Sequence, residues 1–181
     1  LEIKSWGPEI IFNGGTGNTE HRIVDQASDI GLFPKIPMLA TSDWPYRSEE
    51  YWKLHSKNGV GIYILTAYHK DMALTKSGKW LYDAYMKKYG EAPTYSTLNG
   101  FGDLVLLAEA AKRAGSTDGK AMVKELETGS FEFWAGTVTM PQGEGAMWHQ
   151  WTPPVVITQY TAANQLPKDA KLVYTFNYKA K

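Results

Sequence analysis

The sequence predicts an α/β fold with a parallel sheet. Three short apolar runs rich in β-branched residues lie within the first 66 residues, and each is bounded by glycine or proline. Between them, apolar residues recur every three or four positions, which is the spacing of an amphipathic helix. Strands that alternate with helices in this way indicate βαβ units with right-handed crossovers, and such units place neighbouring strands parallel.

A strand, a glycine turn and a helix open the chain. The run Glu9-Ile10-Ile11-Phe12-Asn13 is apolar and β-branched, and glycines follow it directly. A helix should come next, because Asn18 or Thr19 can cap it and apolar residues then recur at helical spacing. Gly31 supplies a left-handed stop. The same pattern of strand and helix continues further along the chain, and it predicts a strand over 36–41, a helix over 48–55 and a strand over 59–66.

Helices are expected in the middle of the chain and short strands near its end. The first of these helices ends at Gly90 and carries Trp80 as a core candidate. The second follows an apolar stripe from Leu98 to Ala114, and the third is capped by Ser116-Thr117-Asp118. Further on, glycine and proline turns separate short strands, which are expected over residues 136–140, 154–160 and 171–178.

The composition excludes several classes of function. The 181 residues include 19 basic and 19 acidic ones, so the formal net charge is zero, and nucleic acid is not an expected partner. The chain has no cysteine, which excludes disulfides, thiolate zinc sites and iron–sulfur clusters. The four histidines lack metal-ligand spacing, and His21 and His55 are expected on exposed helix faces. No metal or cofactor is expected.

Two enzymatic motifs fail at identifiable positions. The glycine turn follows a strand and opens a helix, which is the setting of a dinucleotide-binding fingerprint. Glu20 stands where the third glycine should be, and a carboxylate there would crowd the helix–strand contact and repel a pyrophosphate. A Gly-x-Ser-x-Gly nucleophile elbow is absent. An enzyme is therefore not expected, and a nucleotide enzyme or an α/β hydrolase is a disfavoured rival.

Ligand candidates follow from position along the chain. Ser42 and Asp43 come directly after the second expected strand, where open α/β sheets bind ligands, although the pair can equally serve as a helix cap or turn. Trp44, Tyr46 and Tyr68 lie in loops at the carboxyl ends of strands. An aromatic residue at such a place often contacts a ligand or a facing surface.

Four segments occur in an order that carries a family resemblance. They are the strand, glycine turn and helix of residues 8–32, the helix end from Tyr82 to Pro93, the segment from Ala108 to Asp118, and Gly136-Thr137-Val138 followed by His149-Gln150. In this order they resemble the C-terminal half of a type I periplasmic solute-binding protein, the branched-chain amino acid receptor type that serves ABC transporters.

The resemblance implies a two-lobed fold of which this chain is about half. The fold would consist of parallel, three-layer, Rossmann-like lobes, with a hinge that the chain crosses several times. Residues 1–92 would belong to the second lobe, and residues 93–145 would return to the first. Residues 146–181 would cross the hinge and add the C-terminal strands.

The resemblance also implies where the ligand is held. Contacts are expected after the first strand, at Asn13, Thr16 or Asn18. A carboxylate after the second strand, for which Asp43 or Ser42 is in place, takes the α-amino group of an amino-acid ligand. The ring at the start of the long helix maps to Phe101.

One departure from the family pattern leaves the ligand open. Amino-acid-specific relatives carry an aromatic residue after the paired glycines and a glutamate in the second loop, whereas this chain has Thr16 and Ser42-Asp43. With Trp44 and Tyr68 nearby, an aromatic acid or another small organic ligand suits the site as well as a branched-chain amino acid does.

The function implied by the resemblance is that of the solute-binding component of an ABC importer, which closes two lobes around a small molecule. Its location would be periplasmic or extracytoplasmic with a lipid anchor, and its partner an ABC permease. The alternative is a ligand-sensing regulatory domain of the same fold that transports nothing. Unpaired sheet edges also predict a homodimer or a swapped assembly of this chain.

Overall fold

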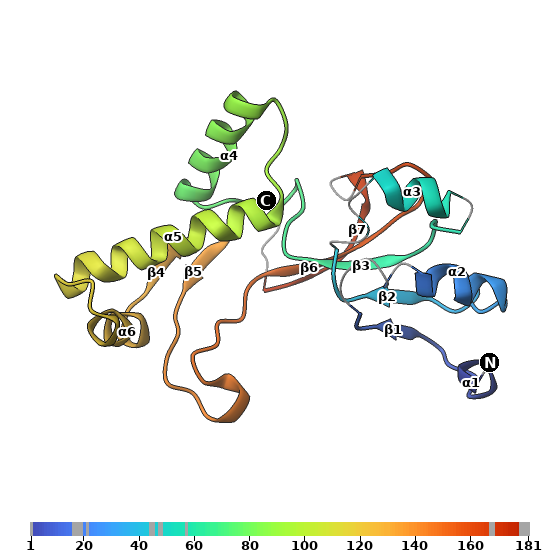
Figure 1. Ribbon diagram of the computed structural model, residues 1–181, viewed down its shortest axis with the longest axis horizontal. Helices are drawn as coiled ribbons and strands as arrows, with labels where there is room; N and C mark the ends of the chain where they lie inside the picture. Colours follow the sequence, from blue (N-terminus) through green and yellow to red (C-terminus); the bar gives the residue numbers. More distant parts are fainter. Residues whose placement is uncertain are drawn as a thin grey trace. The chain divides into compact units, whose positions relative to one another are not determined.

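The computed structural model describes residues 2–15, 20, 22–43, 46, 49–56, 58–166 and 169–177 (Figure 1). These residues form two compact units. Of the described residues, one unit combines those up to Lys70 with those from Val155 to Asn177, and the other is formed by Asp71–Pro154. Among the described residues, no helix is long and apolar enough to cross a membrane.

The first unit is built on a five-stranded sheet whose strand order is β1-β2-β3-β6-β7. The first three strands, β1, β2 and β3, run parallel to their neighbours, while β6 and β7 are antiparallel. Asn13 lies opposite Ala40, and Ala40 lies opposite Ile64, so the parallel strands end at one edge of the sheet. The strand bounds are Ile11–Asn13, Met38–Ala40, Tyr63–Thr66, Val155–Gln159 and Lys171–Phe176 in the same order. The predicted α/β class with a parallel-dominated sheet is confirmed.

Among the described residues, this unit has three α-helices: α1 (Glu2–Ser5), α2 (Arg22–Asp29) and α3 (Glu49–His55). The crossovers from β1 through α2 to β2, and from β2 through α3 to β3, are the predicted βαβ units (Figure 1). Gly31 ends α2 with a φ of 69°, as its left-handed role requires. The expected caps of this helix, Asn18 and Thr19, lie outside the described residues.

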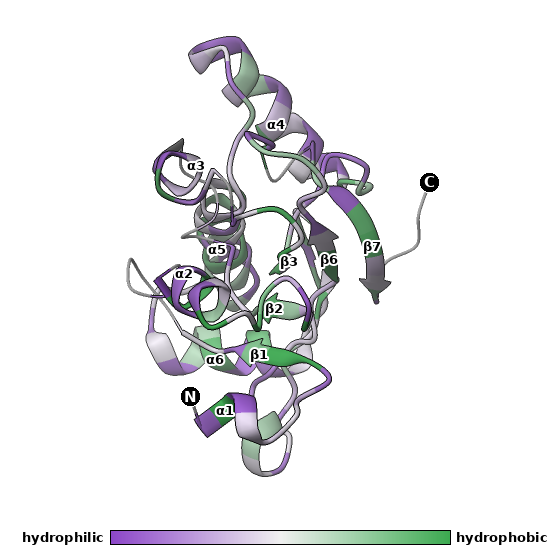
Figure 2. Ribbon diagram, turned by 90° about the vertical axis from the view of Figure 1, so that its right-hand side faces the viewer, coloured by the Kyte–Doolittle hydropathy of each residue, from purple (hydrophilic) through white to green (hydrophobic). Residues whose placement is uncertain are grey.

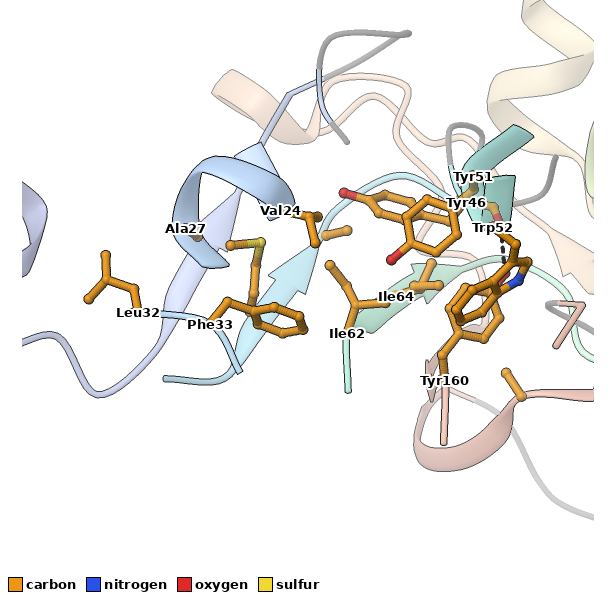
Figure 3. Packing of buried hydrophobic residues seen from close by; sticks show 13 residues of the cluster. Val24, Ala27, Leu32, Phe33, Tyr46, Tyr51, Trp52, Ile62, Ile64 and Tyr160 are labelled. Atoms are coloured by element: carbon orange, nitrogen blue, oxygen red, sulfur yellow. Dashed lines mark hydrogen bonds between the residues drawn. The ribbon is translucent and has the colours of Figure 1, made fainter. Parts of the chain in front are cut away.

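The core of the first unit lies between these helices and the sheet (Figure 3). Val24 and Ala27 reach it from α2, and Tyr51 and Trp52 reach it from α3. They pack against Met38, Ala40 and Ile64 of the strands and against Ile62 and Tyr160, which lie just outside β3 and β6. The opposite face is less covered, since Phe12 of the hydrophobic strand β1 is 66% exposed (Figure 2).

One histidine expectation is wrong. His55 is 1% exposed, and its Nδ1 lies 2.7 Å from Oδ1 of Asp25. The pattern placed it on an outer helix face, but its ring packs against Tyr51, with centroids 4.9 Å apart, and is bonded to Asp25 of α2. His21 lies outside the described residues.

The second unit contains three helices and a hairpin. The helices are α4 (Lys76–Tyr89), α5 (Tyr95–Ala114) and α6 (Gly119–Thr128), and the hairpin strands are β4 (Phe131–Phe133) and β5 (Gly136–Val138), followed by the short helix η2 (Gly145–Met147). Asp118 caps α6 by accepting from the backbone N–H of Ala121 at 3.0 Å, as predicted. Trp80 is 61% exposed rather than buried, although its ring lies 5.6 Å from that of Phe101 on α5.

Candidate functional site

The candidate site is the edge of the sheet where β1, β2 and β3 end. Because the three strands are parallel and in register, the residues that follow them come together there. The predicted residues Asn13, Ser42, Asp43 and Tyr68 all lie at this edge. The structure therefore places four of the predicted ligand residues in one neighbourhood of the first unit.

The Asn13 side chain organises the turn after β1. Its Oδ1 accepts from the backbone N–H of Gly15 at 3.3 Å. Its Nδ2 donates to the backbone oxygen of Glu20 at 3.3 Å and to the hydroxyl of Tyr46 at 3.4 Å. The buried amide is thus already engaged in shaping the glycine turn, and a direct contact from it to a ligand stays a prediction.

Asp43 joins the ends of two strands. Its Oδ2 accepts a hydrogen bond of 2.6 Å from Oγ1 of Thr66, and both residues are buried. The hydroxyl of Thr66 also accepts from the backbone N–H of Tyr68 at 3.4 Å. Thr66 is a site residue that the sequence reasoning missed, although its place as the last residue of the third strand was a usable signal.

Glu20 is the other buried acid at this edge, and it too was missed as a site residue. It is 1% exposed, and the position that a Cβ of Gly15 would take lies 3.2 Å from its Cγ. Burial raises its pKa to about 7, an effect that the nearby Tyr46 hydroxyl opposes. The pKa of Tyr46 is itself raised far above its usual value by burial and by the charge of Glu20, so this tyrosine stays neutral.

Tyr46 differs from the sequence expectation. A loop position suggested an aromatic side chain turned toward a ligand, but Tyr46 is fully buried in the core (Figure 3). Its backbone oxygen accepts from the hydroxyl of Tyr160, and its ring packs edge-on against Tyr51 with centroids 5.1 Å apart. Tyr46 therefore belongs to the core and contacts the candidate site through its hydroxyl, which accepts from the Asn13 amide.

The remaining predicted residues are not part of this described cluster. Thr16, Asn18 and Trp44 lie outside the described residues. Phe101 belongs to α5 in the second unit, where its ring lies 5.6 Å from that of Trp80. Its predicted contact with a ligand stays a prediction.

A hollow elsewhere in the first unit has a different character. Its volume is about 320 Å³, and it is lined by seven apolar residues and Gln26. The lining comes from α1, α2, β1, β2 and the turn after α2, beside the outer edge of β1. A hollow without charged groups does not suit a polar solute, so it is not the candidate ligand site.

The chemistry available at the strand ends is that of recognition. Two carboxyls, a threonine hydroxyl and the backbone groups of the loops can orient a small polar molecule. Over the described part of the chain, no group of three histidine, aspartate or glutamate residues is placed to hold a metal ion.

Comparison with known proteins identifies the family. A family model described as a periplasmic binding protein matches residues 1–165. The chain belongs to this family. No curated protein sequence matches the chain significantly.

Solved structures of similar fold agree with this assignment. A leucine-binding protein of Thermotoga maritima is 21% identical with a TM-score of 0.75. The match covers 97% of this chain and 47% of that one. A second similar structure is the substrate-binding protein of a branched-chain amino acid transporter from Streptococcus pneumoniae, in complex with isoleucine. It is 22% identical with a TM-score of 0.66, and the match covers 94% of this chain and 47% of that one.

A third similar structure has a different ligand. It is the solute-binding protein of an ABC transporter from Rhodopseudomonas palustris in complex with 3,4-dihydroxybenzoic acid. It is 16% identical with a TM-score of 0.62, and the match covers 99% of this chain and 48% of that one. The periplasmic binding protein chain described here thus spans about half the length of the structures it matches.

Proposed function

We propose that this chain is part of the solute-binding component of an ABC importer. The observation that carries the proposal is the match of the periplasmic binding protein model to residues 1–165, combined with buried polar groups at the carboxyl ends of β1, β2 and β3. Open α/β sheets bind ligands at this edge. The partner would be an ABC permease, and the location periplasmic, with or without a lipid anchor.

The proposed ligand is a branched-chain amino acid or a related small organic acid or aromatic compound. Similar structures hold leucine, isoleucine or 3,4-dihydroxybenzoic acid. In this chain Asp43 would accept from an ammonium group, because the two oxygens of a carboxylate can accept several hydrogen bonds, of which the Thr66 hydroxyl supplies one. Tyr68, which is half-buried two residues after β3, would contact the remainder of the ligand.

Binding would proceed by closure of two lobes. A ligand shifts a conformational equilibrium only by the difference between its affinities for the two states, so contacts from both lobes are needed to favour the closed one. In this proposal residues 1–92 belong to the second lobe, residues 93–145 to the first and residues 146–181 to the hinge and the C-terminal strands. One side of such a clamp binds weakly by itself.

Nuclear magnetic resonance titration of this chain tests the proposal. Leucine, isoleucine and 3,4-dihydroxybenzoate are added up to about 10 mM, where a dissociation constant in the millimolar range is measurable. We expect at least one of them to shift the backbone signals of residues 41–43 and 66–68, with an affinity weaker than about 1 µM.

Two variants sharpen the result. Asp43→Asn removes the charge while keeping an oxygen that can accept from Thr66, and we expect it to weaken binding of leucine or isoleucine about tenfold or more. Asp83→Asn is the matched control, because Asp83 is an exposed residue of α4. Absence of shifts at the strand ends with all three compounds, or sub-micromolar binding by this chain, would contradict the proposal.

A further inference from the structure

Glu20 stands out because its carboxyl is buried and poorly supplied with hydrogen-bond donors by the described residues. Neither of its carboxyl oxygens is exposed, and neither makes a hydrogen bond of acceptable geometry with a described residue. It comes seven positions after Asn13, at the end of the glycine turn, and its backbone oxygen accepts from the N–H of Ile23 as α2 begins. An ionised carboxyl in such a place is unstable until a donor is supplied.

The groups around Glu20 can supply little. The amide nitrogen of Asn13 donates its two hydrogen bonds to the backbone oxygen of Glu20 and to the hydroxyl of Tyr46, not to the Glu20 carboxyl. The Tyr46 hydroxyl then acts on the carboxyl and lowers its pKa, but the larger effect of burial leaves that pKa at about 7. Near neutral pH the carboxyl is therefore divided between its neutral and its charged form.

We propose that Glu20 is a ligand-binding residue that receives the positively charged nitrogen of a small organic solute, an ammonium group above all. The inference rests on the proposed function only in taking the carboxyl ends of β1, β2 and β3 as the ligand edge. A compact ammonium group carries three hydrogen-bond donors and a charge, both of which the Glu20 carboxyl needs.

The charge of the edge favours a cation over an acid. The described residues at the strand ends, 14–15, 20, 41–43, 46 and 66–68, include two carboxyls and neither lysine nor arginine. Asp43 already accepts from Thr66, whereas Glu20 has spare acceptor capacity on both oxygens. An anionic ligand group would meet the carboxyl of Asp43 and, in its ionised fraction, that of Glu20, and repulsion between like charges disfavours its binding.

The other titratable groups nearby do not compete for this role. Tyr46 stays neutral, and Tyr51 of α3, which packs on it, has its pKa raised far above the usual value by burial. On α2, Arg22 is exposed and Asp25 is paired with His55. Burial places the pKa of Glu20 at about 7, so the charge of this carboxyl responds to a donor near neutral pH.

The test uses two probes that each carry one charged end of leucine. The first, 3-methylbutan-1-amine, has only the ammonium group, and the second, 4-methylpentanoate, has only the carboxylate. Carbon-13 signals of the Glu20 carboxyl are followed against pH with each probe. We expect the amine to lower the pKa of Glu20 and the carboxylate to leave it unchanged.

The amine should also bind about tenfold more tightly at pH 8 than at pH 6. For a group with a pKa of about 7, the ionised fraction rises from about one tenth to about nine tenths over that interval, and the apparent affinity follows the fraction that can bind. Glu20→Gln keeps the size of the side chain but cannot ionise, so this variant should lose the pH dependence and weaken amine binding. Asp83→Asn should leave both unchanged.

The outcomes separate this inference from the proposed function. Failure of the amine to bind or to move the Glu20 signals overturns the inference, as does tighter binding of the carboxylate or unchanged amine binding by Glu20→Gln. The titration of the unmodified chain decides the matter if that variant does not fold. If leucine shifts the strand ends while Glu20 does not respond, this inference alone fails. If the amine binds through Glu20 while leucine, isoleucine and 3,4-dihydroxybenzoate do not bind, the proposed function alone fails.

Discussion

Replacing Gly102 with alanine tests how α5 packs on the hairpin of β4 and β5. Gly102 lies in the helix interior, directly over the ring of Phe133. A Cβ added there would overlap that ring: it would lie 2.7 Å from Cζ, about 1 Å closer than ordinary van der Waals contact, and closer still to Cε2. The ring is buried, and it also packs against Trp134 and Trp151, so it cannot withdraw freely.

Two opposing terms set the size of the effect. Replacing glycine by alanine in a helix interior stabilises the helix by about 1 kcal/mol. Overpacking a buried contact costs about 1–3 kcal/mol. Gly100, two residues earlier in the same helix, is the matched control, because a Cβ there would meet no atom within 4 Å. The helix term is common to both substitutions, so their difference isolates the overpacking term.

Urea unfolding followed by far-ultraviolet circular dichroism measures that difference. We expect Gly100→Ala to raise the free energy of unfolding by about 1 kcal/mol and Gly102→Ala to fall about 1–3 kcal/mol below that variant. Two variants of equal stability would refute the close contact between α5 and the Phe133 ring.

Two further predictions concern the first unit. Asp25→Ala should lower the free energy of unfolding by about 1–3 kcal/mol, because it removes a carboxylate that lies 2.7 Å from Nδ1 of the buried His55. Asp83→Ala, in the 2.8 Å but exposed pair with Lys79, should cost less than about 0.5 kcal/mol, and equal losses in urea unfolding would contradict this contrast. Glu20→Gln should raise the urea midpoint at pH 8 and change it little at pH 5. The raised pKa means that the folded chain binds the Glu20 proton more tightly than the unfolded chain does. The stability that this proton contributes is complete below the usual pKa of 4.5 and is lost as the pH rises through about 7. A difference in urea midpoint that does not vary with pH would count against this prediction.

The order and type of the main elements could be predicted from local signals. The expected strands 9–13, 36–41 and 59–66 contain β1, β2 and β3, although each strand is shorter than expected. The third shows why. It was expected from Gly59, but the N–H of Gly59 bonds back to the oxygen of His55, and that of Gly61 bonds to Tyr160, so the ladder starts only at Tyr63. Such partners are distant or turn-forming, and the periodicity of apolar residues does not report them.

The candidate site was predictable in its place but not in its chemistry. Strand order alone brings Asn13, Asp43 and Tyr68 to one edge, because parallel strands in βαβ units end on the same side. The sequence could not predict which side chains already make hydrogen bonds within the protein. Asp43 accepts from Thr66, which belongs to the neighbouring strand, and Asn13 accepts from Gly15 in the loop that follows it. Glu20 was noticed only as an obstacle to a pyrophosphate.

The amino-acid sequence by itself determined the α/β class, the helix ends at residues such as Gly31 and Asp118, and the order of segments by which the family is recognised. Those features depend on backbone preferences and on periodicity, which neighbouring residues set. Only the tertiary structure decided that Tyr46 is core, that His55 is buried against Asp25 and that the Glu20 carboxyl has no hydrogen bond of good geometry from a described residue. Burial and pairing depend on residues far apart in the chain, and the pKa of Glu20 follows from that burial.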